Sequence, residues 1–87
     1  MREIPGLAEA FAETLRRFRT QAHLTQRELA ERIGGTSTYI YLLERGKKTP
    51  TLKAFFLLCS ALDANVHEFL DEYFESQAKL SRKPEWP

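Results

Sequence analysis

Hydrophobic residues near the start of the chain recur every three or four positions, which places them on one face of an α-helix. Glycine and proline are absent from the same stretch, so no residue in it interrupts a helix. We predict a first amphipathic helix over residues 7–22, preceded by a short arm, with an inward stripe of Leu7, Phe11, Leu15, Phe18 and Ala22.

A second helix, over residues 26–33, is predicted by its capping residues and its apolar spacing. Thr25 and Glu28 have the spacing of a capping box, in which the threonine hydroxyl and the glutamate carboxylate each accept from a free backbone N–H. The inward positions are Leu29, Ala30 and Ile33. The pair Gly34-Gly35 predicts the end of the helix, because only glycine adopts a positive φ without steric cost.

A third short helix follows directly. Thr36 is suited to cap it, and Ile40 and Leu43 lie three positions apart on its inner face. Gly46 is expected to end it. Two short helices joined across a glycine turn predict a helix-turn-helix over about residues 25–45.

Two more helices complete the predicted fold, an all-α domain of five helices. Thr51 is expected to cap the fourth, whose inner stripe is predicted to be Leu52, Phe55, Leu58, Cys59 and Leu62. After a turn at Asp63-Ala64, Asn65 with Glu68 predicts the cap of a fifth helix that runs through Val66, Phe69, Leu70, Tyr73 and Phe74.

The fourth and fifth helices carry more apolar residues than one inward stripe can hold. The excess consists of Phe56, Leu57, Leu70, Tyr73 and Phe74. An exposed apolar patch is typical of a protein–protein interface, so we predict homodimerisation through these residues. The alternative is that a C-terminal extension folds back over them. From residue 76 the sequence turns polar and basic, which predicts a domain over 1–75 and a loosely held tail over 76–87, with Trp86 as a residue that is costly to expose.

The chain has 87 residues, enough for one small domain. The single cysteine, Cys59, excludes an internal disulfide, favours a reducing compartment and is expected to pack in the core as a small hydrophobe. No apolar run approaches the roughly 18 residues of a membrane helix, and the first residues do not form a signal peptide. We therefore expect a cytoplasmic protein.

The net charge is only +1, but the charge is unevenly distributed. Residues 34–53 carry a net charge of +3, from Arg45, Lys47, Lys48 and Lys53 against Glu44. Residues 54–75 carry a net charge of −5. The basic segment covers the end of the predicted helix-turn-helix, so one end of the molecule is suited to phosphate and the other is not.

This combination of residues resembles the XRE-type family of phage-repressor and Cro-like helix-turn-helix proteins. The matching positions are Leu24-Thr25-Gln26, Glu28-Leu29-Ala30, Ile33-Gly34, Ile40, Glu44-Arg45-Gly46-Lys47 and Pro50, with Leu15, Arg19, Leu62 and Phe69 outside them. The resemblance implies sequence-specific binding of double-stranded DNA by a small dimeric regulator, a repressor or autoregulator, in a prokaryotic or phage-type cytoplasm and associated with the nucleoid. It also implies that His23 ends the first helix in a left-handed conformation.

The resemblance further implies which residues contact DNA. Those expected on the DNA backbone are Gln26, Thr36, Lys47 and Lys48, and those expected to read bases are Ser37, Thr38 and Leu42, flanked by Tyr39 and Tyr41. The base-reading set lacks Arg, Lys, Gln and Asn, the side chains that make paired hydrogen bonds to purines. We therefore expect modest specificity per base, with contributions from DNA shape and from paired half-sites about 34 Å apart on a near-palindromic site.

Two more features follow from the resemblance. Arg19 and Glu44 are expected to form an ion pair that ties the first helix to the end of the third. Gly35 replaces a branched apolar residue that the family usually has there, so the third helix is expected to be held less firmly.

The residue inventory argues against an enzyme. One cysteine and two distant histidines provide no set of metal ligands, and no glycine loop or nucleophile–base pair is present, so we expect no cofactor, metal or catalytic residue. The remaining alternative to a DNA-binding regulator is a protein-binding adaptor or antitoxin on the same fold, favoured by the neutral third helix and the apolar fifth. A purely structural dimer module has only the apolar excess in its favour.

Overall fold

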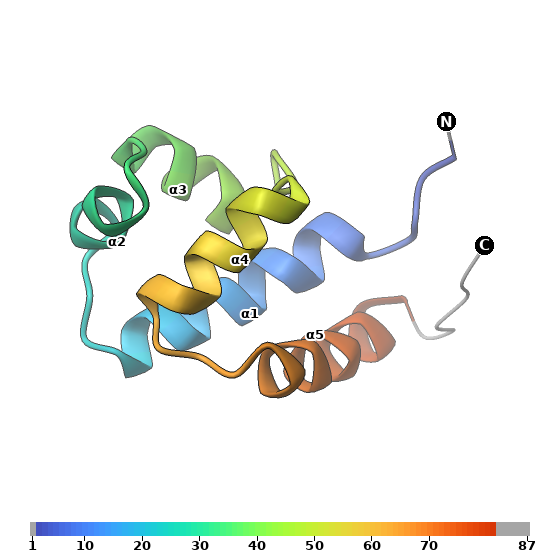
Figure 1. Cartoon of the computed structure of the whole chain (residues 1–87). Coiled ribbons are helices and arrows are strands. Elements are labelled where there is room, and N and C mark those ends of the chain that lie inside the picture. Colours follow the sequence, from blue (N-terminus) through green and yellow to red (C-terminus); the bar gives the residue numbers. More distant parts are fainter. Residues whose placement is uncertain (1, 82–87) are drawn as a thin grey trace.

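The computed structural model describes residues 2–81, and its regular elements are five α-helices (Figure 1). They are α1 (Leu7–Gln21), α2 (Gln26–Ile33), α3 (Ser37–Glu44), α4 (Leu52–Ala61) and α5 (Val66–Ser81). The expected all-α fold is confirmed. Within residues 2–81, no helix is long and apolar enough to cross a lipid bilayer.

Four of the helices begin at the capping residues that the sequence predicts. Thr25 and Glu28 form a complete capping box: the Thr25 hydroxyl accepts from the Glu28 N–H at 3.0 Å, and the Glu28 carboxylate accepts from the Thr25 N–H at 2.9 Å. The remaining caps are Thr36 for α3, Thr51 for α4 and Asn65 for α5. Because these bonds satisfy amides that no helical partner can reach, they fix where each helix starts.

Residues with positive φ end the helices and turn the chain. His23 has a φ of 59°, as the resemblance implied, and Gly34 and Gly46 have φ values of 71° and 70°. The prediction for the glycine pair needs a correction: Gly34 alone takes the left-handed conformation, and Gly35 does not. One left-handed residue suffices because the Gly34 and Gly35 N–H groups already satisfy the last carbonyls of α2.

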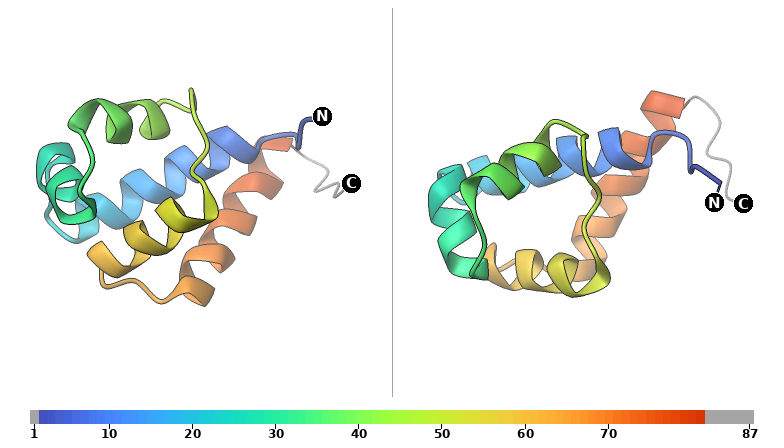
Figure 2. Two further views of the ribbon diagram at one scale, coloured as in Figure 1. Left: turned by 45° about the horizontal axis from the view of Figure 1, so that its top comes forward. Right: turned by 90° about the horizontal axis from the view of Figure 1, so that it is seen from above.

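The core lies around α1, which contacts both α3 and α5 (Figure 2). In Figure 1, α3 lies above α1 and α5 below it, so the two outer helices occupy opposite sides. Four phenylalanines join α1, α4 and α5: the Phe69 ring packs against Phe18 at 5.0 Å, Phe55 at 5.3 Å and Phe11 at 5.5 Å between ring centroids. Aromatic rings at these distances contribute beyond the area they bury, so they anchor α5 on α1.

A polar seam shows that α5 runs antiparallel to α1. Arg17 donates to Glu72 at 2.9 Å, the Ser76 hydroxyl donates to Glu13 at 3.3 Å, and Gln77 donates to the carbonyl of Pro5 at 3.2 Å. Ser76 and Gln77 are buried by these contacts. Helix α5 continues past the predicted boundary at residue 76 as far as Ser81, because Ser76 and Gln77 face polar groups of α1 and of the segment before it instead of solvent. Trp86 lies outside the described residues.

Two residues occupy environments opposite to those predicted. Leu52 was expected in the inner stripe of α4 but is 70% exposed, because it is the first residue of that helix and precedes the turn that packs on the core. Tyr73 was expected on an exposed partner surface but is only 4% exposed, because it lies one turn after Phe69 on the face of α5 that packs against α1. Cys59 lies in the core as predicted, and burial raises the pKa of its thiol.

Candidate nucleic-acid interface

The outer face of α3 is polar and accessible along most of its length. Ser37 and Thr38 in the first turn are exposed, and Tyr41 in the second turn is 47% exposed. Leu42 is half-buried, and Tyr39 is half-buried with its ring packed against the core. Of the five residues expected to read bases, Ser37, Thr38 and Tyr41 therefore present the most surface.

Glu44 holds α3 in place by accepting hydrogen bonds from two other helices. Arg19 of α1 donates to both of its carboxylate oxygens through Nε and Nη2, the latter at 2.9 Å, and donates through Nη1 to the Leu24 carbonyl at 2.8 Å. Gln26 of α2 donates through Nε2 to the same carboxylate at 3.2 Å. The Glu44 side chain is 4% exposed and the Arg19 side chain 14%. The hydrogen bond and the charge of Glu44 raise the pKa of Arg19 against the opposing effect of burial, so the guanidinium stays charged.

The expected contact residue Gln26 is thus fixed in position before any ligand binds. A glutamine amide has two N–H donors, and only one of those of Gln26 is needed for Glu44. Gln26 is also the first residue of α2, so it belongs to the turn whose free backbone amides form the positive end of the helix dipole. Thr36, by contrast, uses its hydroxyl to cap α3, accepting from the Tyr39 N–H at 3.1 Å.

The cations that follow α3 have no acidic partners among residues 2–81. Arg17, Arg19 and Arg27 each form an ion pair with a carboxylate. Arg45, Lys47 and Lys48 are exposed and form none within that range. Two of them lie over aromatic rings instead: the Arg45 guanidinium carbon is 5.9 Å from the Tyr41 ring centroid, and Lys48 Nζ is 5.8 Å from that of Tyr39. These three positive charges are therefore available to an anion.

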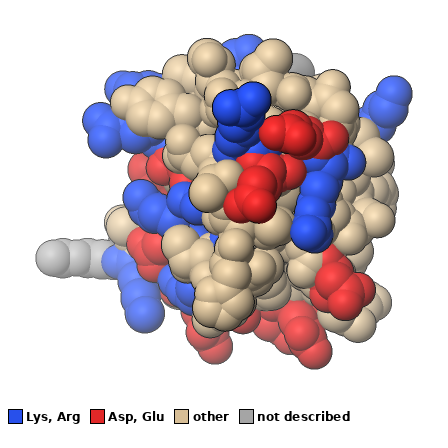
Figure 3. Space-filling model, turned by 90° about the vertical axis from the view of Figure 1, so that its left-hand side faces the viewer, with Lys and Arg blue, Asp and Glu red and all other residues tan. Residues whose placement is uncertain are grey.

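The face of the molecule at the α2 end has a different electrostatic character. Figure 3 shows acidic and basic side chains next to each other there, without a large area of one sign. Helix α2 itself contributes Arg27, Glu28, Glu31 and Arg32, and Arg27 pairs with Glu31 at 3.4 Å. Opposite charges at this spacing largely cancel, so the α2 face attracts a polyanion less than the segment after α3.

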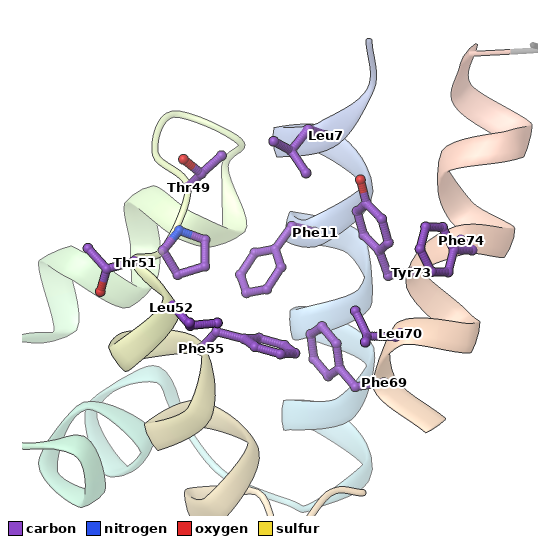
Figure 4. A pocket seen from close by; sticks show the side chains of 11 residues that line it. Leu7, Phe11, Thr49, Thr51, Leu52, Phe55, Phe69, Leu70, Tyr73 and Phe74 are labelled. Atoms are coloured by element: carbon purple, nitrogen blue, oxygen red, sulfur yellow. The ribbon is translucent and has the colours of Figure 1, made fainter. Parts of the chain in front are cut away.

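A second candidate surface is an apolar hollow of about 360 Å³ between α1, α4 and α5. Figure 4 shows side chains of all three helices facing it, among them Phe11, Leu52, Phe55, Leu70 and Tyr73. Large exposed apolar residues near the hollow are Leu52 at 70%, Phe56 at 51% and Phe74 at 42%. Of the predicted dimer residues, Phe56, Leu57, Leu70 and Phe74 thus have accessible surface, whereas Tyr73 forms part of the wall.

The Tyr73 hydroxyl is buried and has no hydrogen-bond partner within residues 2–81. Burial also raises the pKa of this phenol, so the group stays neutral.

Residues 2–81 contain no group of three or more His, Cys, Asp or Glu that could hold a metal ion. The two candidate surfaces are therefore a polar, cationic one around α3 and an apolar one around α5.

Comparison with known proteins identifies the family. A helix-turn-helix family profile matches residues 15–69, which span all of α2, α3 and α4. The chain belongs to the XRE-type helix-turn-helix family. The match confirms the resemblance drawn from the sequence.

Individual XRE-type proteins are similar over most of this chain. Control protein C.SmaI from Serratia marcescens is 36% identical over 64 residues, covering 74% of this chain and 76% of the relative. The crystal structure of the clp gene regulator ClgR from Corynebacterium glutamicum has a TM-score of 0.82 at 38% identity, covering 88% of this chain and 82% of that one. The restriction-modification controller protein C.Esp1396I, solved as a tetramer with its natural 35 base-pair operator, has a TM-score of 0.74 at 23% identity, covering 80% and 92%. At 23% identity, the similarity to C.Esp1396I shows a shared fold alone.

Sequence reasoning missed two residues that the structure brings to these surfaces of the XRE-type chain. Arg45 was counted as a charge, but its i, i+4 spacing from Tyr41 indicates the contact between them. Leu52 was placed in the core, although its position directly after the Thr51 cap makes it the first residue of α4, where few other residues cover a side chain. Both signals are local in the sequence, and both concern helix ends.

Proposed function

We propose that this XRE-type protein is a small homodimeric transcriptional regulator, a repressor or autoregulator, that binds double-stranded DNA sequence-specifically in the prokaryotic cytoplasm, associated with the nucleoid. The observation that carries the proposal is the arrangement around α3. Helix α3 has an exposed polar face and is held at its C-terminal end by Glu44, and three cations without acidic partners in residues 2–81 follow directly after it. A rigid recognition helix next to free cations meets the two requirements of major-groove binding, base contact and phosphate contact.

In this proposal α3 enters the major groove with its N-terminal half, and α2 lies across the sugar–phosphate backbone. Gln26 donates its second amide hydrogen to a phosphate, beside the N-terminal amides of α2. Lys47 and Lys48 bind phosphates on the other side of the groove, and Thr36 approaches a phosphate at the start of α3. The charge distribution supports this orientation, because the acidic segment 54–75 then lies away from the DNA.

Base recognition is assigned to Ser37, Thr38, Tyr39, Tyr41 and Leu42. Hydroxyl groups bond to several bases, and a leucine or the threonine methyl contacts the thymine methyl group. Each such contact discriminates weakly between bases. The dimer offsets this weakness, because two half-sites in a fixed register multiply the selectivity of one.

Dimerisation is assigned to the apolar surface of α4 and α5 formed by Phe56, Leu57, Leu70 and Phe74, together with the hollow beside Tyr73. Exposed aromatic and leucine side chains around a hollow are the anchors and the pocket that a stable interface needs. Three similar proteins are the control protein C.SmaI, the clp gene regulator ClgR and the restriction-modification controller protein C.Esp1396I, and the last was crystallised as a tetramer on its operator. The first two support a regulatory role, and the third supports a regulator that acts as an oligomer.

The deciding experiment is selection of bound fragments from a random double-stranded DNA library at near-physiological salt. We expect a two-fold symmetric motif whose half-sites lie about one helical turn apart. Such a motif supports specificity and dimer geometry together. Binding that is weak, uniform across sequences and abolished by moderate salt contradicts the proposal and favours a protein partner instead.

A further inference from the structure

The proposed base-reading set has no side chain that makes a paired hydrogen bond to a base. Ser37, Thr38, Tyr39 and Tyr41 carry one hydroxyl each, and Leu42 carries none. Arginine is the side chain that most often recognises guanine, because its fork of N–H donors matches the O6 and N7 acceptors in the major groove. The helix itself contains no arginine, but its C-cap residue is Arg45.

The contact between Arg45 and Tyr41 places the guanidinium nearer to the N-terminus of α3 than the backbone of Arg45 lies. Helical side chains lean toward the N-terminus of their helix, and the Arg45 guanidinium carbon lies 5.9 Å from the centroid of the Tyr41 ring, one turn earlier. Tyr41 is 47% exposed and Arg45 is exposed, so both remain accessible from outside. The charged group is thus at the level of the second turn of α3, where it lies over the Tyr41 ring.

The same contact leaves the donors of Arg45 unused. A guanidinium that lies over an aromatic ring interacts through its flat face, and its N–H groups project from its edge. Within residues 2–81 no carboxylate pairs with Arg45, and no hydrogen bond of its side chain is formed there. A planar fork of free donors that is restrained by a ring fulfils the chemical requirements of a guanine reader.

We propose that Arg45, held over Tyr41, recognises one guanine in each half-site through O6 and N7, and that it is the main specificity-determining residue of the protein. This assignment rests on the proposed function, since it presupposes that α3 enters the major groove. It also separates the roles of neighbouring cations: Lys47 and Lys48 bind phosphate, whereas Arg45 reads a base. The Tyr41 ring acts as a positioning group, because it limits the rotamers that the arginine samples.

The experiment compares the DNA motifs selected by four proteins from the same random library: wild type, Arg45→Ala, Arg45→Lys and Tyr41→Phe. For wild type we expect one strongly enriched guanine per half-site. Replacing that guanine by 7-deazaguanine, which lacks the N7 acceptor, should weaken wild-type binding about tenfold. Arg45→Ala should lose the enrichment and become indifferent to 7-deazaguanine. Arg45→Lys should lose most of the discrimination while keeping the salt dependence, and Tyr41→Phe should retain both because it keeps the ring.

The outcomes separate this assignment from the proposed function. A wild-type protein that selects no motif contradicts the proposed function itself. The inference is overturned if Arg45→Ala selects the same motif as wild type and binds all sequences with equally reduced affinity. In that case the slope of log affinity against log salt concentration should fall by about one per protomer, which assigns Arg45 to a phosphate. Lys79→Ala, an equal change of charge on the exposed side of α5, is the matched control and should alter neither the motif nor the slope. Circular dichroism and thermal unfolding of each variant establish that it is folded.

Discussion

The carboxylate of Glu44 accepts from Arg19 on α1 and from Gln26 on α2, and it thereby fixes the end of α3 to both neighbouring helices. A carboxylate at 4% exposure is costly to bury unless its oxygens are hydrogen-bonded. Here three donors from two side chains surround it. The orientation of the proposed recognition helix therefore depends on an ion pair whose members lie 25 residues apart.

Removal of Arg19 should be strongly destabilising. In Arg19→Met the Glu44 carboxylate stays buried without its counter-ion, which should lower the free energy of unfolding by about 3–5 kcal/mol. The matched control is Arg17→Met, which breaks ion pairs to Glu13 and Glu72, whose side chains are 40% and 35% exposed. That change should cost less than about 1 kcal/mol. Urea unfolding followed by circular dichroism measures both, and equal costs would show that Glu44 is stabilised by other means.

The two glycines between α2 and α3 should respond in opposite ways to alanine. A Cβ at Gly35 would meet only the Ile33 side chain, at 3.5 Å and 3.6 Å, which is ordinary van der Waals contact. Gly35→Ala should therefore raise the free energy of unfolding by about 0.4–1 kcal/mol, through the reduced freedom of the unfolded chain. Gly34→Ala should lower it by about 1–2 kcal/mol, because the φ of +71° disfavours any residue with a Cβ. A destabilised Gly35→Ala protein would contradict the first expectation and indicate strain that the local contacts do not account for.

The capping box of α2 should make stability depend on acid. Hydrogen bonds from the Thr25 backbone N–H, and then the Thr25 side chain, hold the pKa of Glu28 below its ordinary value. A carboxyl group whose pKa is lower in the folded state contributes stability above its unfolded pKa of about 4.3, and this contribution is lost as the pH falls through the folded value. Glu28→Gln retains an acceptor but cannot titrate. The thermal midpoint of Glu28→Gln should lie below that of wild type at pH 7. The difference between the two midpoints should shrink as the pH falls below the pKa of Glu28.

A suitable control for that measurement is Glu31→Gln, since Glu31 lies on the same helix but takes no part in the cap. If both variants approach the wild-type midpoint in the same way as the pH falls, the acid dependence does not come from the capping box.

Local rules account for most of what the sequence predicted correctly. The caps at Thr25, Thr36 and Thr51 were predictable because each is decided by a few neighbouring residues. The Arg19–Glu44 pair is not local and could be expected only from the family resemblance. The errors on α5 have a common cause: whether Tyr73 and Ser76 are buried depends on which face of α5 meets α1, and a helix that is apolar around much of its circumference does not show that face in its sequence.

The contact residues depend even more on tertiary structure. Their positions on α3 predicted that Tyr39 and Tyr41 both contact bases. Only the packing of α3 shows that Tyr39 packs against the core while Tyr41 stays about half exposed. The hydrogen bond from Gln26 to Glu44 was likewise not predictable, because it needs the angle between α2 and α3. The sequence therefore predicts which helix forms the proposed interface, and packing decides which side-chain atoms on that helix are accessible.

The apolar surface of α5 should control the oligomeric state. Leu70→Asp places a charge beside the hollow and should convert the proposed dimer into a monomer, measured by light scattering coupled to size exclusion. The control is Lys79→Asp, which places an aspartate at an exposed position of α5 one turn after Glu75 and on a different side of the helix from Leu70. That variant should remain dimeric. A wild-type protein that is already monomeric at tens of micromolar would contradict the assignment of this surface.

The two kinds of phosphate contact proposed for Gln26 and Lys47 should be separable by salt. Each lysine that neutralises a phosphate releases counter-ions, so Lys47→Ala should lower the slope of log affinity against log salt by about 0.9 per protomer and weaken binding to all sequences. Gln26 is uncharged, so Gln26→Ala should weaken binding equally at every salt concentration without changing the slope. Fluorescence anisotropy with the selected site and a scrambled duplex, across a salt series, measures both effects. If a protein that carries both Gln26→Ala and Lys47→Ala binds DNA with undiminished affinity, neither residue contacts the DNA backbone. The cations after α3 would then have to bind another ligand.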